Sequence, residues 1–294
     1  MRRALRWTWL LLLMPATARA HAEDGVWTFD PWVVTPLLLS ATMYGLGLVV
    51  LWRRAEIGRG IRRWQAACYG AGWLLLAVTL LSPLHWLGEQ LFTAHMVEHE
   101  LIMAVAAPLL VLGRPIGAFL WALPVPLRLW LGRAGRLRRL RTGWSVVTAS
   151  VPATIWHGAV IWFWHVPVLF DGAVAYVSLH RLQHLSFLVS ALAFWWALAR
   201  RADKGTAVLL LFVTMVHTTI LGALLVLAAR VLFPGQTALA PQWHLTPLQD
   251  QQLAGLVMWV PASTVYAAAA LVFAALWVRQ SSEVWRRGDP LRTP

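Results

Sequence analysis

The sequence has one cysteine and few charged residues, and each shortage excludes a class of protein. A single cysteine, Cys68, leaves no partner for an internal disulfide, and we interpret it as a packing residue near a helix end. Only 13% of the residues are charged, whereas 59% are hydrophobic. A water-soluble core of 294 residues does not need that much apolar surface, so an ordinary soluble domain is excluded.

Strictly alternating segments are also missing, which argues against a membrane β-barrel. Long apolar runs are present instead, and in lipid such runs satisfy their backbone groups as helices. Neither an internal repeat nor a low-complexity linker divides the chain, so we expect one membrane domain over residues 21–294. The sequence predicts an all-α, polytopic membrane helix bundle with seven transmembrane helices. Their expected spans are 32–52, 64–87, 91–113, 144–170, 180–199, 206–230 and 251–278.

Residues 1–20 have the pattern of a secretory signal peptide. Three arginines among the first six residues precede an apolar run, Trp7 to Met14, that is too short to span a bilayer. The small residues Ala18 and Ala20 form a cleavage site. An uncleaved anchor is the alternative. Cleavage after Ala20 would leave His21 as the mature N-terminus, where its imidazole and α-amine could chelate copper together.

Arginine and lysine are concentrated in alternate loops, and the loops between them carry acidic residues instead. The positive-inside rule places the basic loops in the cytoplasm, so the N-terminus lies outside, the C-terminus lies inside and the number of spans is odd. The formal charge of +13 is therefore explained by a bacterial inner membrane topology, with the lipid bilayer and no nucleic acid as partner. The segment Ile116–Arg141 is expected to lie along the lipid headgroups. The basic stretches are 53–63, 114–141, 200–204 and 279–292.

The ten histidines all fall in the predicted outer half of the membrane or outside it. Ionisable side chains within a membrane are functional candidates by default. His95, His99 and Met103 are spaced by four residues and share one helix face. Imidazole suits copper and zinc, and thioether sulfur selects copper(I), so this mixed set favours copper. Further candidate ligands are His157, His165, His180, His184 and His217, whereas His85 and His244 are expected at the outer rim.

Two other chemistries use similar residues. The run from His95 to His99 fits the H-x-x-E-H pattern of inverted zinc proteases, with Glu98 as the general base, although no acidic third ligand is evident. Two histidines on facing helices can also ligate a haem iron. Alternatively, Glu98 does not bind the metal itself but orients a histidine that does.

Several motifs follow one another between Ser82 and Pro261. They are SPL at 82–84, HMVEH at 95–99, APLLVLGRP at 107–115, WH at 156–157, HVP at 165–167, FWW at 194–196 and LTPLQDQQLAG at 245–255. In this order they resemble the CtaG family of caa-type cytochrome c oxidase assembly factors. The resemblance implies a multipass protein that helps to mature a haem–copper oxidase at its copper centre, with oxidase subunits as partners. It implies functional roles for His95, His99, His165, His180, His184 and Asp250.

Asp250 begins the last predicted helix, where it either caps that helix or orients a metal-bound histidine. The leading hypothesis is an assembly factor that binds copper at its outer face and delivers it to an oxidase subunit, without catalysis. One alternative is a copper transporter, which would need polar residues reaching the cytoplasmic side. The other is a haem- or zinc-dependent membrane enzyme.

Overall fold

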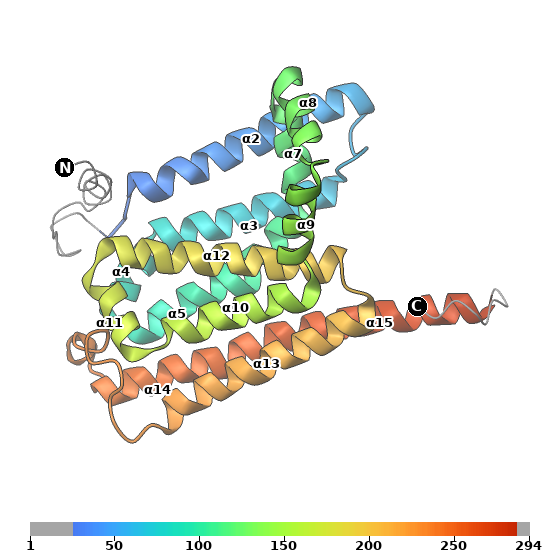
Figure 1. Ribbon diagram of the computed structural model, residues 1–294. Coiled ribbons are helices and arrows are strands. Elements are labelled where there is room, and N and C mark those ends of the chain that lie inside the picture. The colour runs from blue at the N-terminus through green and yellow to red at the C-terminus, as the bar shows by residue number, and fades with distance from the viewer. Residues whose placement is uncertain (1–25, 287–294) are drawn as a thin grey trace, which may run out of the picture.

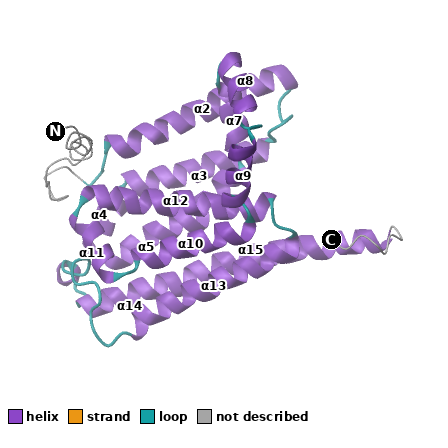
Figure 2. Ribbon diagram, in the orientation of Figure 1, coloured by secondary structure: helices purple, strands orange, loops and turns teal. Residues whose placement is uncertain are grey.

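The computed structural model describes residues 26–286, which contain helices and no strand (Figures 1 and 2). The expected signal peptide and His21 lie outside the described residues. Six helices within them are long and apolar enough to cross a membrane, and a bent helix pair makes seven if it counts as one span. The prediction of an all-helical, multipass membrane protein is confirmed to this extent.

Three predicted spans agree with single helices of the structure. They correspond to α2 (Pro31–Ala55), α12 (Val177–Arg200) and α13 (Lys204–Leu227). The predicted span 64–87 is wrong at its end, because it divides into α3 (Arg63–Leu81) and α4 (Pro83–Gln90). The Ser82 side chain accepts the N–H of Leu84 and caps α4, and Pro83 takes the first helical position, where its missing N–H is tolerated.

The predicted span 144–170 is also wrong as one helix. It divides into the end of α9 (Arg138–Val147), α10 (Ser150–Trp164) and α11 (Pro167–Ala175), with a bend of 61° between α9 and α10. Pro152 lies in the first turn of α10 and Pro167 begins α11. A proline ring collides with the carbonyl four residues earlier in a continuous helix, so each proline marks a new start.

The predicted spans 91–113 and 251–278 each contain a wide π-helical turn. The first consists of α5 (Phe92–Glu100), η2 (Leu101–Ala106) and α6 (Ala107–Leu112). The second consists of α14 (Pro247–Val257), η4 (Met258–Ala262) and α15 (Ser263–Arg286). Pro108 follows the first π turn and Pro261 lies within the second, as expected where a proline interrupts the helical hydrogen bonds.

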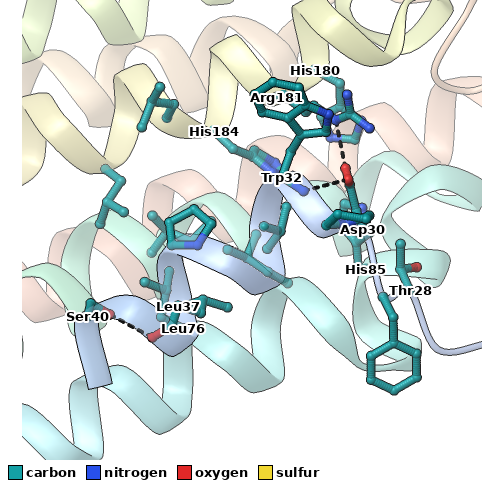
Figure 3. A pocket seen from close by; sticks show the side chains of 18 of the residues that line it. Thr28, Asp30, Trp32, Leu37, Ser40, Leu76, His85, His180, Arg181 and His184 are labelled. Carbon is teal, nitrogen blue, oxygen red and sulfur yellow. Dashed lines mark hydrogen bonds and ion pairs between the residues drawn. The ribbon is translucent and has the colours of Figure 1, made fainter. Parts of the chain in front are cut away.

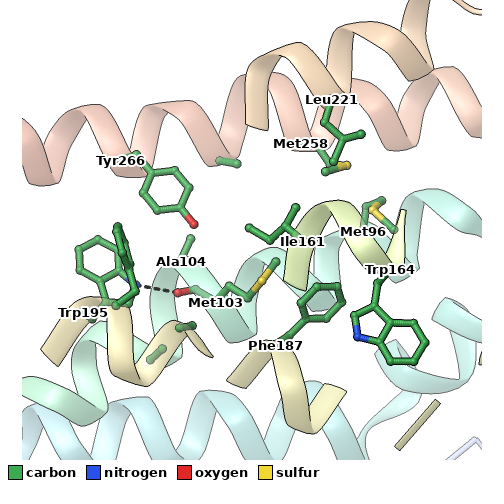
Figure 4. Close-up of a cluster of buried hydrophobic side chains, with 14 of the residues drawn as sticks. Met96, Met103, Ala104, Ile161, Trp164, Phe187, Trp195, Leu221, Met258 and Tyr266 are labelled. Atoms are coloured by element: carbon green, nitrogen blue, oxygen red, sulfur yellow. Dashed lines mark hydrogen bonds between the residues drawn. The ribbon is translucent and has the colours of Figure 1, made fainter. Parts of the chain in front are cut away.

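The first π turn leaves one backbone carbonyl without its helical hydrogen bond, and a tryptophan side chain donates to that carbonyl instead. The N–H of Ala107 bonds to Ile102, five residues earlier, and Pro108 has no N–H. The carbonyl of Met103 is therefore left without its usual helical donor, and the indole of Trp195 on α12 donates to it at 2.9 Å (Figure 4). This bond ties α12 to the helix that carries His95 and His99.

The basic segments lie together at one end of the bundle. There, α7 (Pro115–Ala122), α8 (Val125–Ala134) and α9 run across the other helices (Figure 1). The loops from α2 to α3 and from α12 to α13 lie at the same end, whereas α4 and α11 lie at the opposite end. The structure thus places the basic loops at one end and the alternate loops at the other, as the charge pattern predicts. The orientation of the chain in the membrane stays a prediction.

Candidate metal centre

Five histidine side chains from three helices converge at the end of the bundle opposite the basic segments. His85 lies on α4, His95 and His99 lie on α5, and His180 and His184 lie on α12. Ring centroids are 4.3 Å apart for His95 and His99 and 4.5 Å apart for His180 and His184. Both pairs are spaced by four residues, which places them on adjacent turns of one helix face. The two pairs meet at 5.1 Å between His99 and His184.

Two groups of three histidines have the geometry to hold a metal ion. One group is His85, His180 and His184, and the other is His95, His99 and His184. Within each group the ligand nitrogens lie within 4.8 Å of one another. These are the only such groups of histidine, cysteine or acidic side chains among residues 26–286.

The buried imidazoles have nitrogens without a hydrogen-bond partner. His95 and His99 are 2% and 1% exposed, and neither ring nitrogen of either one makes a well-aligned hydrogen bond. The Nε2 atoms of His180 and His184 are also buried and unpartnered. Unsatisfied polar atoms of this kind are rare in proteins and point to a missing ion or water. Neutral imidazole nitrogen is a suitable ligand for copper or zinc, so the residues fit such an ion.

Glu98 fixes the orientation of His85. Its Oε1 atom lies 2.9 Å from Nδ1 of His85, and the carboxylate is fully buried. A carboxylate on one ring nitrogen leaves the other nitrogen, Nε2, to face an ion. Gly88 of α4 makes this arrangement possible, because a Cβ atom there would overlap the Glu98 carboxylate.

Asp250 supports the site through a helix, and its hydrogen bonds do not go to a histidine. Its two carboxylate oxygens accept the backbone N–H groups of Phe92 and Thr93 at 2.8 and 3.0 Å, and one of them also accepts the Thr93 hydroxyl at 2.7 Å. These groups form the start of α5, where free N–H groups and the helix dipole favour a negative charge. Asp250 therefore caps α5 from α14. Thr246, which accepts the N–H of Gln249, caps Asp250's own helix.

The remaining predicted ligands lie outside both groups. The Nδ1 atom of His165 bonds to the carbonyl of Ile161 at 2.7 Å, and the ring of Phe170 contacts both the His165 ring and the His95 ring. His157 bonds to Ser190 at 3.1 Å. His217 lies against the backbone of Gly158 on the helix of His157, and Met103 packs in the apolar core (Figure 4).

His85 is the member of the cluster that the sequence analysis assigns to the outer rim. The break at Ser82 turns α4 back beside α5 and brings His85 next to Glu98. A buried acid inside a predicted membrane helix needs a partner, and this need is the signal in the sequence that indicates a nearby histidine.

A cleft of about 2020 Å³ lies between α2 on one side and α3 and α12 on the other. Its lining is mostly apolar and includes Leu37 and Leu76 (Figure 3). At the histidine end it is lined by His85, His180 and His184, and it does not reach His95 or His99. The Arg181 side chain donates to Asp30 at 2.6 Å and ties the start of α2 to α12 at this end.

Comparison with known proteins places this arrangement in a family. Residues 42–280 match the family described as cytochrome c oxidase caa3 assembly factor. The chain belongs to this family. The match covers both helices of the cluster's core, α5 and α12, and confirms the resemblance found in the sequence motifs. Membership in the family supports a role in cytochrome c oxidase assembly.

Similar proteins occur in mycobacteria. The chain is 27% identical over 281 residues to uncharacterized proteins of Mycobacterium bovis and Mycobacterium tuberculosis, and 27% identical over 287 residues to one of Mycobacterium leprae. Each match covers 90% of this chain but only 41% of the relative. The chain therefore spans about two fifths of the length of these relatives. No solved structure matches the chain.

Proposed function

We propose that the chain is an oxidase assembly factor that binds copper in the histidine cluster, on the outer face of the membrane, and delivers it to a subunit of cytochrome c oxidase. The observation that carries this proposal is the convergence of five imidazoles, four of which have buried, unpartnered nitrogens, in a protein of this family. Imidazole nitrogen is a strong ligand for copper, and divalent copper binds a given set of nitrogen ligands more tightly than the other first-row metals do.

The arrangement of Glu98 argues against the zinc protease alternative. In that mechanism the glutamate between the two histidines would activate a metal-bound water. Here one oxygen of Glu98 is hydrogen-bonded to His85, and the other is packed beside Gly88. Glu98 thus supports a ligand, which suits binding and delivery better than hydrolysis.

The position of the cluster argues against transport across the membrane. Both three-histidine groups lie at one end of the bundle, and the described residues contain no comparable group toward the arginine end. A transporter needs ligands along the whole path, whereas a protein that exchanges copper with an outer partner needs them on one side. Copper uptake by cells that express this chain alone would revive the transport alternative.

The test is elemental analysis of the detergent-purified chain beside the double variant His95→Ala/His99→Ala. We expect about one copper per chain in the parent and a loss of most of it in the variant, because two buried ligands are removed. His244→Asn is a matched control, because His244 is exposed, lies outside the cluster and has a positive φ that asparagine adopts readily. A folded parent without copper, or one with a haem Soret band, would overturn the proposal.

The cellular half of the test uses a strain that lacks its own copy of the protein. The parent chain should restore oxidase activity and the copper content of the oxidase, and the double variant should not. Full restoration by the double variant would show that the histidines are not needed for delivery.

A further inference from the structure

The two histidine groups share one member, His184, and this overlap has a chemical consequence. His85 and His180 belong only to one group, and His95 and His99 belong only to the other. An ion held by the first group and an ion held by the second would each use His184. The groups are therefore suited to be alternative positions for a single ion.

The two positions differ in their access. His85, His180 and His184 are half-buried and line the cleft, as Figure 3 shows. His95 and His99 are buried behind them and do not line it. One position is therefore open to the cleft, and the other is closed within the bundle.

The rings form a continuous series between the two positions. Centroids are 5.4 Å apart for His85 and His180, 4.5 Å for His180 and His184, and 5.1 Å for His184 and His99. His95 also lies 5.4 Å from His180. An ion can therefore exchange ligands one at a time. Stepwise exchange matters here because a charge without ligands is costly in an apolar interior.

Glu98 makes the open position suitable for a cation even though it is half-buried. Its carboxylate holds His85, and no other ion pair of a histidine with an acid occurs among the described residues. The closed position has no carboxylate bonded to its ligands and offers three neutral imidazoles, a set that suits copper(I).

We propose that His85, His180 and His184 form an exchange site at the cleft, that His95, His99 and His184 form a holding site behind it, and that a single copper ion passes between the two with His184 as the shared ligand. This inference rests on the proposed function, because it requires copper to be the cargo. It involves no change of oxidation state, and the ion moves by replacement of one imidazole by another.

The test measures how fast copper(I) enters and leaves the full-length chain in detergent. Copper(I) is supplied under reducing, oxygen-free conditions and then withdrawn by an excess of a coloured copper(I) chelator, followed by absorbance. The first variant is His85→Gln, which removes the imidazole ligand and leaves a neutral amide in its place. His180→Gln removes the other ligand that only the exchange site uses, and His244→Asn is the control.

We expect His85→Gln and His180→Gln to keep about one copper per chain but to load and release it at least about tenfold more slowly, because the route through the cleft is damaged. His95→Ala/His99→Ala should hold its residual copper weakly and release it at least about tenfold faster. His184→Ala should lose both the tight holding of copper and its exchange through the cleft. The control should match the parent.

Four results would overturn the inference. Unchanged rates in His85→Gln and His180→Gln, with full copper content, would refute the exchange site and leave the proposed function intact. Complete loss of copper in these variants would indicate one site of five ligands. Two copper ions bound together in the parent would refute alternation. A folded parent that takes up no copper would overturn the proposed function as well.

Discussion

At the scale of single residues, the site depends on two acids that act in different ways. Glu98 touches a ligand, His85, and Asp250 holds the helix that carries His95 and His99. Both carboxylates are fully buried. Removing either one would leave buried hydrogen-bonding groups without a partner, which costs free energy. Two substitutions of similar size should therefore have distinguishable effects.

Replacing Glu98 with glutamine should weaken copper binding by about 10–100-fold, which is the usual effect of removing a carboxylate that orients a metal-bound histidine. The measurement is a competition titration with a copper(I) chelator. Glu100→Gln is the matched control, because Glu100 is a buried acid on the same helix and is bonded to none of the five histidines. Equal losses in both variants would indicate a general effect of replacing a buried acid on this helix and would refute a specific role for Glu98.

Replacing Asp250 with asparagine should lower the stability by about 1–3 kcal/mol, because an amide offers one acceptor oxygen where two are used and turns its NH₂ group toward a backbone N–H. The measurement is the Tm in detergent.

Asp203→Asn is the matched control for this prediction. Asp203 caps α13 with the same pair of bonds, to the N–H and hydroxyl of Thr206, but it is exposed. Those bonds from Thr206 lower the pKa of Asp203, so it is charged at neutral pH. Asparagine is an equally good cap at an exposed site, so the Tm should barely change. A Tm shift of the same size in both variants would contradict the buried role of Asp250.

The sequence could indicate four of the five clustered histidines but not their grouping. His95, His99, His180 and His184 are recognisable from their spacing and from the predicted depth. The partition into two groups depends on contacts between helices far apart in the chain, and helix packing is not encoded in local spacing. The expected place of His85 at the outer rim does not indicate its contact with Glu98, because that contact depends on the break at Ser82.

At the scale of elements, α2 is held to its neighbours by contacts in the middle of the helix as well as at its start. Tyr44 stacks on Tyr69 and donates its hydroxyl to the carbonyl of Gly113. Gly47 lies directly against the carbonyl of Ala118 on α7, where no side chain fits. Small residues at such crossings allow membrane helices to approach closely.

Gly47→Ala should therefore destabilise the protein by about 1–3 kcal/mol, because a Cβ atom would overlap the backbone of α7 and force the helices apart. The expected readout is a lower Tm. Gly45→Ala provides the comparison on the same helix, since its Cβ would meet nothing within 4 Å. That variant should be neutral or slightly more stable. A neutral Gly47→Ala would mean that α2 does not pack closely on α7.

The lengths of the elements were predictable where no proline intervenes, as in α12. The breaks at Ser82 and before Pro167 have local signals in the sequence, a capping side chain or a proline. Hydropathy alone does not detect them, so it is not sufficient to predict where these helices end. The π turns are harder to predict. Pro108 indicates a disturbance, but the bond from Trp195 that satisfies the freed carbonyl of Met103 comes from a helix about 90 residues away.

At the scale of the whole molecule, the basic loops and the clustered histidines occupy opposite ends. Under the positive-inside rule, the histidine end faces away from the cytoplasm. Labelling of single cysteines in intact cells, with Cys68 replaced by serine, tests this orientation. Ala238→Cys, in the exposed loop between α13 and α14, should react with a membrane-impermeant maleimide. Arg59→Cys, between α2 and α3, should react only after permeabilisation, and the reverse pattern would invert the topology.

The cleft beside α2 also makes the surrounding amphiphile a component of the site. Because its lining is mostly apolar, lipid or detergent chains that enter this space would border three of the proposed ligands and would set the dielectric constant around an ion held there. Detergents with short chains and lipids with long chains would fill the space differently. Copper affinity and exchange rate should therefore vary with acyl chain length at constant protein sequence, in the same way that a solvent tunes a coordination complex.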